Sequence, residues 1–360
     1  MGAETIKLLT TVLALLMAFS VVVTPFLIVE KVNATEGGSW TTLASLPEAS
    51  SHIGAVVLDG KIYVIGWSAC EKYDPETNNW TTIASVPFYS GGSVVACQNK
   101  IYIIGGNPTQ VYDPATDTWE NRTAIPWARS SMQANVVDDK IYLIGGRLSA
   151  GLYIVNTSNR NDVYDPETDT WSQMTPIPLS VMGYASTVFD DKIYIISGGN
   201  ESGPDYEPTD LVQIFDPTTN LWTFGARIPT RVCYAKAGLT TGLSAPERIY
   251  VIGGTTVYYD RWATYNVINL TQIYNPETDT WTTGTPMPTS RCSMKLAVVN
   301  DEIYAIGGVK DEEHLAVNEK YTPSGYIPEF PSWIILPLVL TATGVVVIYR
   351  KRLTKAAQAY

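Results

Sequence analysis

The chain has 360 residues, of which 27 are glycine and 11% are aromatic, and its formal net charge at pH 7 is −11. A chain of this length is far above the size at which burial of a core becomes marginal. The acidic balance argues against nucleic acid as a partner, because a surface that binds nucleic acid must neutralise phosphates with lysine and arginine.

The chain begins with an apolar run that has the features of a targeting segment. Leu8 to Val29 carries no charge over 22 residues and follows Lys7. Val32-Asn33-Ala34 has the small-residue form of a cleavage site, so we interpret residues 1–34 as a secretory signal peptide. The run is long for the apolar part of a signal peptide, and an uncleaved anchor helix is the alternative interpretation.

Residues 35–323 repeat one phrase six times. An apolar strand carries Ile-Tyr and usually Gly-Gly, and then come Tyr-Asp-Pro, a tryptophan and a loop that contains proline. A period of about 40 residues predicts an array of supersecondary units, none of which can bury its faces alone. The repeated positions are Tyr63, Tyr102, Tyr142, Tyr194, Tyr250 and Tyr304, with Trp40, Trp80, Trp119, Trp171, Trp222 and Trp281.

The residue types within each repeat predict strands joined by tight turns. Segments such as Lys61 to Ile65 alternate as strands do, and Tyr and Trp supply large contact areas between neighbouring sheets. The Asp-Pro-Glu-Thr segments have turn chemistry, since Asp hydrogen-bonds its own backbone and Pro fixes φ. These acidic turns lack the dense alternating oxygen ligands of a calcium loop, so we expect no calcium there. We also expect no other metal and no cofactor.

The last repeat is one strand short. Its inner strands are expected between Leu296 and Gly308 and its third strand near Glu319-Lys320-Tyr321, but no Trp strand follows them. An orphan Trp strand, Ser39 to Leu43, stands at the other end of the repeats. We expect the orphan strand to complete the sixth unit, which would close a ring and remove the edge strands.

These repeats resemble the kelch repeat, a four-stranded propeller blade. The best copy has Lys100-Ile101-Tyr102-Ile103-Ile104-Gly105-Gly106, then Val111-Tyr112-Asp113-Pro114, then Thr118-Trp119. Other copies depart from it: Gly66-Trp67 replaces the diglycine of the first unit, and Asn275 replaces the aspartate of the fifth. The resemblance implies an all-β fold, a six-bladed kelch-type β-propeller over residues 35–323.

The carboxyl end carries a second apolar segment. Residues 324–332 are expected to be a linker and residues 333–349 a transmembrane helix, with the basic cluster Arg350-Lys351-Arg352 in a cytoplasmic tail at 350–360. Pro328 to Trp333, together with this helix and cluster, resembles the PEF-type sorting signal of archaeal surface proteins, whose tail is recognised by a membrane transpeptidase. An ordinary stop-transfer helix is the alternative, and both place the propeller outside the cell.

Two residue types fit an exterior location. Four cysteines permit disulfides there in three pairings, and buried free thiols are the alternative. Asn-x-Ser/Thr sequons are acceptors for glycosylation in secreted proteins. The cysteines are Cys70, Cys97, Cys233 and Cys292, and the sequon asparagines are Asn33, Asn79, Asn121, Asn156, Asn200 and Asn269.

Candidate binding residues lie in the loops. The connection between the second and third strands is short in the second unit, Asn107 to Thr109, and long in the third to sixth units. Loops on a rigid scaffold usually carry binding, and aromatic residues with arginine favour protein and sugar contacts. The alternatives are aromatic rings that fold back on neighbouring blades and solvated loop arginines. The candidates are Tyr258, Tyr259, Arg261, Trp262 and Tyr265 of the fifth unit, with Arg129, Arg231 and Arg291.

No complete catalytic set is evident. The only histidines, His52 and His314, are too few for a copper site. We therefore expect a membrane-anchored binding or adhesion module for an extracellular protein or glycan, and not an enzyme. One alternative is a sugar-active enzyme, a lyase or a sialic-acid-isomerase-like protein, with arginines at the channel mouth. The other is a structural component of a surface layer.

Overall fold

The computed structural model describes residues 37–50, 53–66, 70–87, 92–150, 154–200, 207–258 and 265–324. The expected signal peptide, transmembrane helix, sorting signal and cytoplasmic tail lie outside these residues, as does the expected linker after Ser324. Within the described ranges, no helix is long and apolar enough to cross a membrane.

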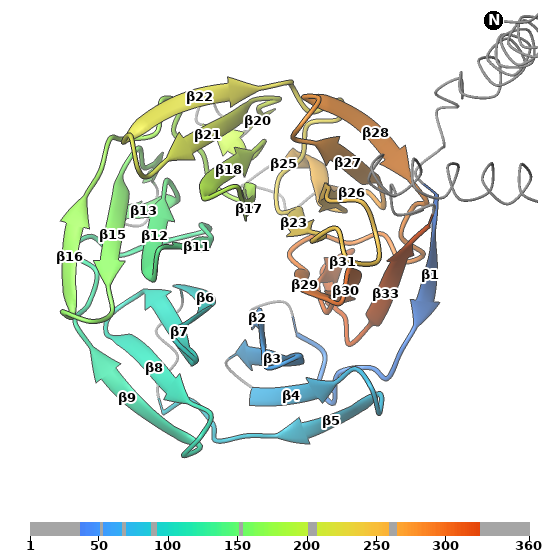
Figure 1. The fold of residues 1–360 in the computed structure, drawn as a ribbon, viewed down its shortest axis with the longest axis horizontal. Helices are drawn as coiled ribbons and strands as arrows, with labels where there is room; N and C mark the ends of the chain where they lie inside the picture. The colour runs from blue at the N-terminus through green and yellow to red at the C-terminus, as the bar shows by residue number, and fades with distance from the viewer. Residues whose placement is uncertain are drawn as a thin grey trace, which may run out of the picture. The chain divides into compact units, whose positions relative to one another are not determined.

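The described residues form six four-stranded antiparallel sheets arranged as blades around a central channel (Figure 1). Each blade runs from an inner strand at the channel to an outer strand at the circumference. Blades one to three are β2(Ile53–Leu58)–β3(Lys61–Gly66)–β4(Cys70–Asp74)–β5(Asn79–Thr82), β6(Gly92–Cys97)–β7(Lys100–Gly105)–β8(Thr109–Asp113)–β9(Thr118–Arg122) and β11(Ala134–Val137)–β12(Lys140–Ile144)–β15(Asn161–Asp165)–β16(Thr170–Gln173).

The other half of the ring repeats this order, and this confirms the all-β six-bladed propeller. Blades four to six are β17(Ala185–Phe189)–β18(Lys192–Ile196)–β21(Val212–Asp216)–β22(Leu221–Gly225), β23(Lys236–Leu239)–β24(Ile249–Ile252)–β27(Thr271–Asn275)–β28(Thr280–Gly284) and β29(Lys295–Val299)–β30(Glu302–Ile306)–β33(Asn318–Pro323)–β1(Gly38–Thr42).

The predicted closure of the ring is confirmed. Strand β1 pairs antiparallel with β33, so that Trp40 lies opposite Tyr321 and Gly38 lies opposite Pro323. The amide of Ser324 also donates a hydrogen bond to the carbonyl oxygen of Gly37, at 2.7 Å. The two ends of the described propeller therefore meet at one place, and blade six has no unpaired outer edge on its third strand.

The ring has two different rims. The turn rim holds the Asp-Pro turns and the turns between first and second strands, and the loop rim holds the connections from second to third strands. Four additional small sheets arise at the loop rim, in blades three to six, because those connections are long. They are β10(Arg129–Ser130)–β13(Arg147–Ala150)–β14(Ile154–Thr157), β19(Gly199–Asn200)–β20(Glu207–Pro208), β25(Thr255–Tyr258)–β26(Tyr265–Val267) and β31(Val309–Lys310)–β32(Glu313–His314).

The repeated tryptophans join each blade to the blade before it. Every indole N–H donates to a backbone carbonyl in the preceding blade-to-blade connection, at 2.8 to 3.1 Å. Each indole also packs against the aromatic ring of the third strand of its own blade. The tryptophan–acceptor pairs are Trp40–Thr285, Trp80–Ala44, Trp119–Ala84, Trp171–Thr123, Trp222–Thr175 and Trp281–Ala226.

The turn after the third strand completes this seam. In blade two, Oδ1 of Asp117 accepts from the Tyr112 hydroxyl at 2.6 Å and from the amide of Ala84 in the preceding connection at 2.9 Å. Asp117 adopts a φ of 54°, a left-handed conformation that Asp and Asn tolerate better than most residues. The hydrogen bond from Tyr112 lowers the pKa of Asp117. In blades two, three and five the Tyr, the Asp and the Trp therefore form one unit that holds adjacent blades together.

The four cysteines are free thiols, and all are buried. The sequence left disulfides and buried free thiols as alternatives, and in the structure the four cysteines are buried free thiols without a disulfide between them. Burial raises the pKa of Cys97 to about 11 and that of Cys233 to about 12. Because the thiolate is the reactive form, these cysteines are packing residues and not nucleophiles.

Candidate functional site

The inner strands of all six blades surround a cavity in the central channel. Its volume is about 270 Å³, against the ~10–15 Å³ that one water molecule needs on the same measure. The cavity lies where the inner strands begin, near the loop rim. Residues at the same register of the inner strands line it, namely Gly54, Ser93, Gln133, Lys236 and Lys295, and Ser186 lies one position further along in blade four.

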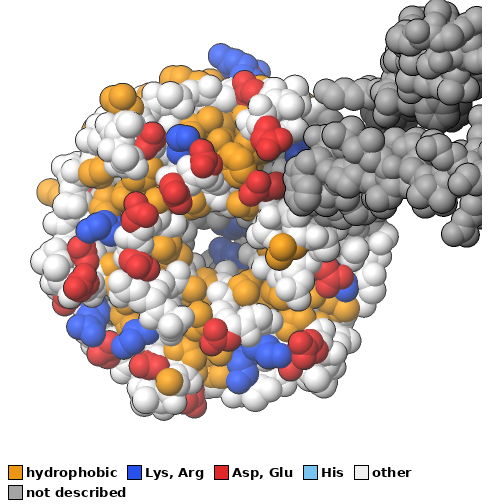
Figure 2. Space-filling model, viewed as in Figure 1, with side chains coloured by type: hydrophobic (Ala, Val, Ile, Leu, Met, Phe, Trp, Pro, Cys, Tyr) orange, Lys and Arg blue, Asp and Glu red, His pale blue; other side chains and the backbone are white. Residues whose placement is uncertain are grey.

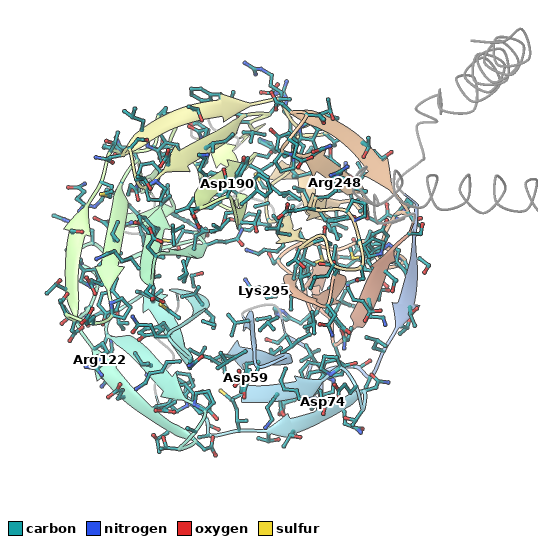
Figure 3. The ribbon with its side chains drawn as sticks, viewed as in Figure 1. Asp59, Asp74, Arg122, Asp190, Arg248 and Lys295 are labelled. Carbon is teal, nitrogen blue, oxygen red and sulfur yellow. The ribbon has the colours of Figure 1, made fainter. Side chains whose placement is uncertain are left out.

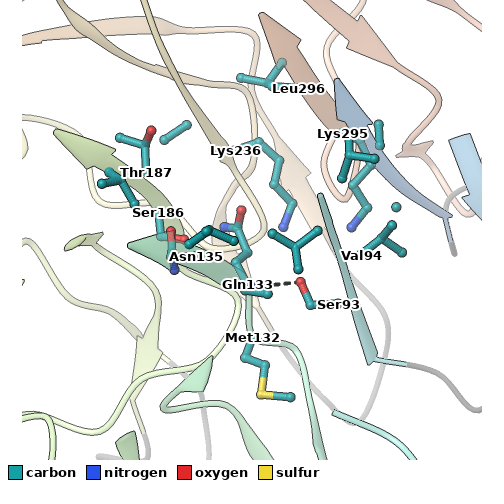
Figure 4. Close-up of a pocket in the computed structure, with 18 of the residues that line it drawn as sticks. Ser93, Val94, Met132, Gln133, Asn135, Ser186, Thr187, Lys236, Lys295 and Leu296 are labelled. Carbon is teal, nitrogen blue, oxygen red and sulfur yellow. Dashed lines mark hydrogen bonds between the residues drawn. The ribbon is translucent and has the colours of Figure 1, made fainter. Parts of the chain in front are cut away.

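Two lysines project into this cavity from adjacent blades (Figure 4). Lys236 begins β23 and Lys295 begins β29, and each lies opposite the isoleucine near the end of its blade's second strand. Their amino groups are close enough to hydrogen-bond to each other. Figure 3 places Lys295 at the central opening of the ring. Neither lysine forms a salt bridge within the described part of the chain.

Confinement changes the ionisation of both amines. Burial in the channel lowers the pKa of Lys295 to about 8. Burial, and then repulsion from Lys295, lowers the pKa of Lys236 well below its usual value. The remaining lining residues carry no titratable side chain, so no carboxylate in the cavity wall stabilises the protonated form of either amine.

The opposite wall of the cavity is polar. Asn135 on β11 is 5% exposed and Ser186 on β17 is 6% exposed. Among the described residues, neither the Asn135 amide nitrogen nor the Ser186 hydroxyl has a hydrogen-bond partner. Gln133, by contrast, already donates to the Tyr184 carbonyl oxygen at 2.6 Å. Buried polar groups are almost always hydrogen-bonded, so two unpartnered groups at a cavity wall indicate a place for a polar ligand or ordered water.

The channel site was not among the residues that the sequence had singled out. The signal is present, however, because Lys236 and Lys295 occupy the same position of the fifth and sixth repeats, where the other repeats have small or neutral residues. An alignment of the repeats on the inner strand finds both lysines. The Ile-Tyr and Trp positions, which define the repeat, lie further out and carry no information about the channel.

Two of the sequence-predicted aromatic candidates, Tyr258 and Tyr265, belong to the β25–β26 hairpin on the loop rim. Tyr258 and Tyr265 pair across this hairpin through their backbones. Their side chains lie outside the described part of the structure, as do Tyr259, Arg261 and Trp262 entirely. Their proposed role as contact residues therefore stays a prediction.

Two of the three arginine candidates are not surface residues. Arg129 is 4% exposed and Arg291 is 0% exposed, and each forms a salt bridge inside its own blade, with Asp162 and Glu319 respectively, at 2.5 Å. Each arginine also donates to a carbonyl oxygen of the second strand. Desolvation by burial lowers the pKa of both guanidinium groups. The expectation that Arg129 and Arg291 present charge to a partner is wrong, whereas Arg231 is exposed.

These two salt bridges have a neutral counterpart in blades four and five. There the third strand carries glutamine at the same register, and Gln272 accepts from the amide of Thr230 at 2.8 Å and donates to its carbonyl oxygen at 3.0 Å. Gln213 makes the same pair of bonds to Leu179. In each case the buried polar group fixes the connection that enters the blade. Arg129 and Arg291 therefore position loops, and they do not converge on one reaction centre.

An aromatic contact that the sequence analysis missed lies on the loop rim of blade three. Trp127 is 59% exposed, and the guanidinium of Arg160 lies 5.7 Å from the centroid of its ring. Arg160 is held in turn by Asp162, at 2.8 Å. Trp127 stands outside the repeated Trp position, and this was the signal available in the sequence.

The predicted glycosylation asparagines differ in exposure. Asn79 and Asn121 are exposed, Asn200 and Asn269 are half-buried, and the Asn156 side chain lies outside the described ones. Asn269 donates to the carbonyl oxygen of Met287 at 3.0 Å. Modification of these sites stays a prediction. No group of His, Cys, Asp or Glu in the described ranges is arranged to hold a metal ion.

The closed ring of six four-stranded blades, with its Tyr–Asp–Trp seams, defines a β-propeller. The family model for the KLHDC2/KLHL20/DRC7 Kelch-repeats domain matches residues 91–308, and the Kelch motif matches residues 49–87. The chain therefore belongs to the kelch-repeat family, whose propellers typically bind proteins.

Similar proteins cover most of the propeller. Kelch-like protein 26 of Danio rerio is 28% identical over 279 residues, which cover 74% of this chain and 37% of that protein. Kelch repeat and BTB domain-containing protein 12 of Homo sapiens is 30% identical over 184 residues, with coverages of 48% and 28%. This chain thus spans about a third of the length of these relatives. The solved structure of YjhT has a TM-score of 0.66 at 18% identity, covers 77% of this chain and 95% of that one, and shows the fold alone.

Proposed function

We propose that this protein is a protein-binding module held at the outer surface of a cell membrane, and that the loop rim is its contact surface. The observation that carries the proposal is the asymmetry of the ring. The additional hairpins of blades three to six all extend the loop rim. A rigid ring with elaborated connections on one rim is the usual arrangement of a binding scaffold.

The loop rim has the residue chemistry of a protein contact. Trp127 is mostly exposed and Arg160 lies across its ring, and Trp and Arg are prominent among the residues that dominate binding energies. The sequence between β25 and β26 adds further aromatic residues and an arginine to the candidates, from Tyr258 to Tyr265.

The orientation follows from the chain direction. A third strand runs from the loop rim to the turn rim, so β33 ends at the turn rim, where Gly38 lies opposite Pro323. We propose that a signal peptide or anchor before residue 35 and a helix at 333–349, with or without processing of a PEF-type tail, attach the ring by its turn rim. The loop rim then faces away from the membrane.

The test compares the two rims of the full-length protein. Binding is measured against a panel of purified extracellular proteins and against a glycan array. A Trp127→Ala/Arg160→Ala variant should lose roughly tenfold or more in affinity for a protein ligand. The control variant replaces three exposed turn-rim residues, Glu76, Glu167 and Glu277, by Ala and should bind normally. Loss of binding in the control alone would show that the contact surface is the turn rim, and ligands found only on the array would show a glycan-binding protein.

A further inference from the structure

The central channel holds two lysine amines, and no carboxylate lines the cavity to pair with either of them. The nineteen residues that line the cavity include Lys236 and Lys295 but no carboxylate. This is unusual in a chain of net charge −11, in which many of the described lysines are paired with Asp or Glu. Bringing two amines together in a confined space opposes their protonation, unless an anion lies between them or beside them.

The cavity also provides hydrogen-bond donors facing these charges. The amide nitrogen of Asn135 and the hydroxyl of Ser186 are buried, unpartnered and at the cavity wall. Figure 4 shows both residues on strands across the cavity from the two lysines. Amines on one side and neutral donors on the other match a molecule with an anionic oxygen group and further polar oxygens.

The cavity is accessible from outside the ring. Figure 2 shows a hollow at the centre of the propeller, with Lys or Arg side chains visible inside it. Its volume of about 270 Å³ is enough for a small molecule and far too small for a folded partner.

We propose that the central channel binds a small molecule through an oxyanion group, a carboxylate or a phosphate, which Lys236 and Lys295 contact together while Asn135 and Ser186 donate hydrogen bonds to its other oxygens. This site is separate from the loop rim. It adds a small-molecule ligand to a protein whose proposed partner is a protein. Because amines with an anion between them hold their protons more strongly, binding takes up protons at a pH near the lowered pKa of Lys295, about 8.

The test is calorimetric titration of the full-length protein with inorganic phosphate and, separately, with acetate and with glycolate. We expect one-site binding of at least one probe. Its enthalpy should depend on the ionisation enthalpy of the buffer near pH 8, since protons are taken up, and its affinity should fall as pH rises and the amines deprotonate. Binding of phosphate alone or of the carboxylates alone identifies the anion class.

Variants separate this site from nonspecific attraction. Lys236→Met and Lys295→Met should each weaken binding roughly tenfold or more, because a charge-assisted contact is lost. The matched control is Lys140→Met, whose amine pairs with Asp165 away from the cavity. Removing one of two repelling amines should leave thermal stability unchanged or higher, so the variants are expected to fold. If either fails, Ser186→Ala, combined with Asn135→Ala, gives a second measurement. Equal affinity in wild type and channel variants, or no binding by any probe, overturns the proposal.

Discussion

The indole nitrogen of Trp40 donates a hydrogen bond to the carbonyl oxygen of Thr285, 245 residues further along the chain, at 2.9 Å. The same contact in the other five blades joins residues only 35 to 55 positions apart. Trp40 therefore joins the two ends of the propeller through the same contact that joins blades consecutive in sequence elsewhere in the ring. Ring closure in this protein depends on one strand, β1.

Removal of the Trp40 side chain should weaken closure. Trp40→Ala should lower the free energy of unfolding by about 2–3 kcal/mol, somewhat below the cost of a fully buried tryptophan because Trp40 is half-buried. Trp40→Phe keeps the ring contact with Tyr321 and loses the hydrogen bond, at a cost of about 1 kcal/mol. Urea unfolding measures both values.

The control is Trp127→Ala, which removes a tryptophan of the same size from an exposed position outside the seams, and should change stability by less than about 0.5 kcal/mol. Deletion of residues 35–45 should have a larger effect than Trp40→Ala, because it exposes β33 as an edge. A deletion variant as stable as the full chain would show that the pairing of β1 with β33 is dispensable.

The architecture could be predicted because the residues that define a blade recur in each repeat. Tyr112, Asp117 and Trp119 recur at fixed spacing, so the seam and the blade count follow from the sequence. Closure of the ring could be predicted in the same way, because the strand at Trp40 is the fourth strand that the sixth repeat lacks. The repeated phrase does not mark which loop arginine is buried. Arg231 is exposed and Arg291 is buried because they stand one position apart in their repeats: Arg291 aligns with the buried Val232 and pairs with Glu319 of the third strand. The proposed contact residues stand at positions that differ between repeats, and the repeated phrase gives no signal there.

Asp301 should make stability depend on acid pH. Its carboxylate is 2% exposed and accepts hydrogen bonds from the backbone amides at Thr241, Leu243, Ser244 and Ala245, at 2.5 to 3.1 Å. Although burial alone would raise it, these bonds lower the pKa of Asp301. A carboxyl with a lowered folded-state pKa stabilises the fold above its unfolded pKa of about 3.9, and this contribution is lost as pH falls through the folded pKa.

The measurement is urea unfolding of wild type and Asp301→Ala at pH 7 and near pH 3. At pH 7 the variant should be less stable by roughly 3 kcal/mol, because backbone donors of the connection between β23 and β24 lose a charged acceptor. Near pH 3 the difference should be smaller. The exposed Asp138→Ala serves as control, and a pH-independent difference would contradict the assigned role of the Asp301 charge.

The proposed membrane orientation predicts a definite pattern of protease access. Protease added to intact cells should cleave the propeller, whereas a tag placed after Tyr360 should stay protected as long as the tail is retained, because the basic cluster at 350–352 would hold it on the cytoplasmic side. Immunoblotting with an antibody to the propeller and one to the tag separates the two. A propeller that resists protease on intact cells and is cut only after lysis would contradict the extracellular location.

The buried Arg291–Glu319 pair predicts a stability effect that can be reversed by a second substitution. Arg291→Val should destabilise the protein by about 3–5 kcal/mol, since the Glu319 carboxylate is left buried without its partner. Blade five has an uncharged pair at the same positions, Val232 and Gln272. The Gln272 side chain hydrogen-bonds to both the amide and the carbonyl group of Thr230. The double variant Arg291→Val/Glu319→Gln should therefore recover most of the loss, because the introduced amide can bond the backbone of Thr289 in the same way. Urea unfolding of the two single variants and the double variant gives the coupling energy. A double variant no more stable than Arg291→Val would show that the salt bridge does more than hold the connection entering the blade.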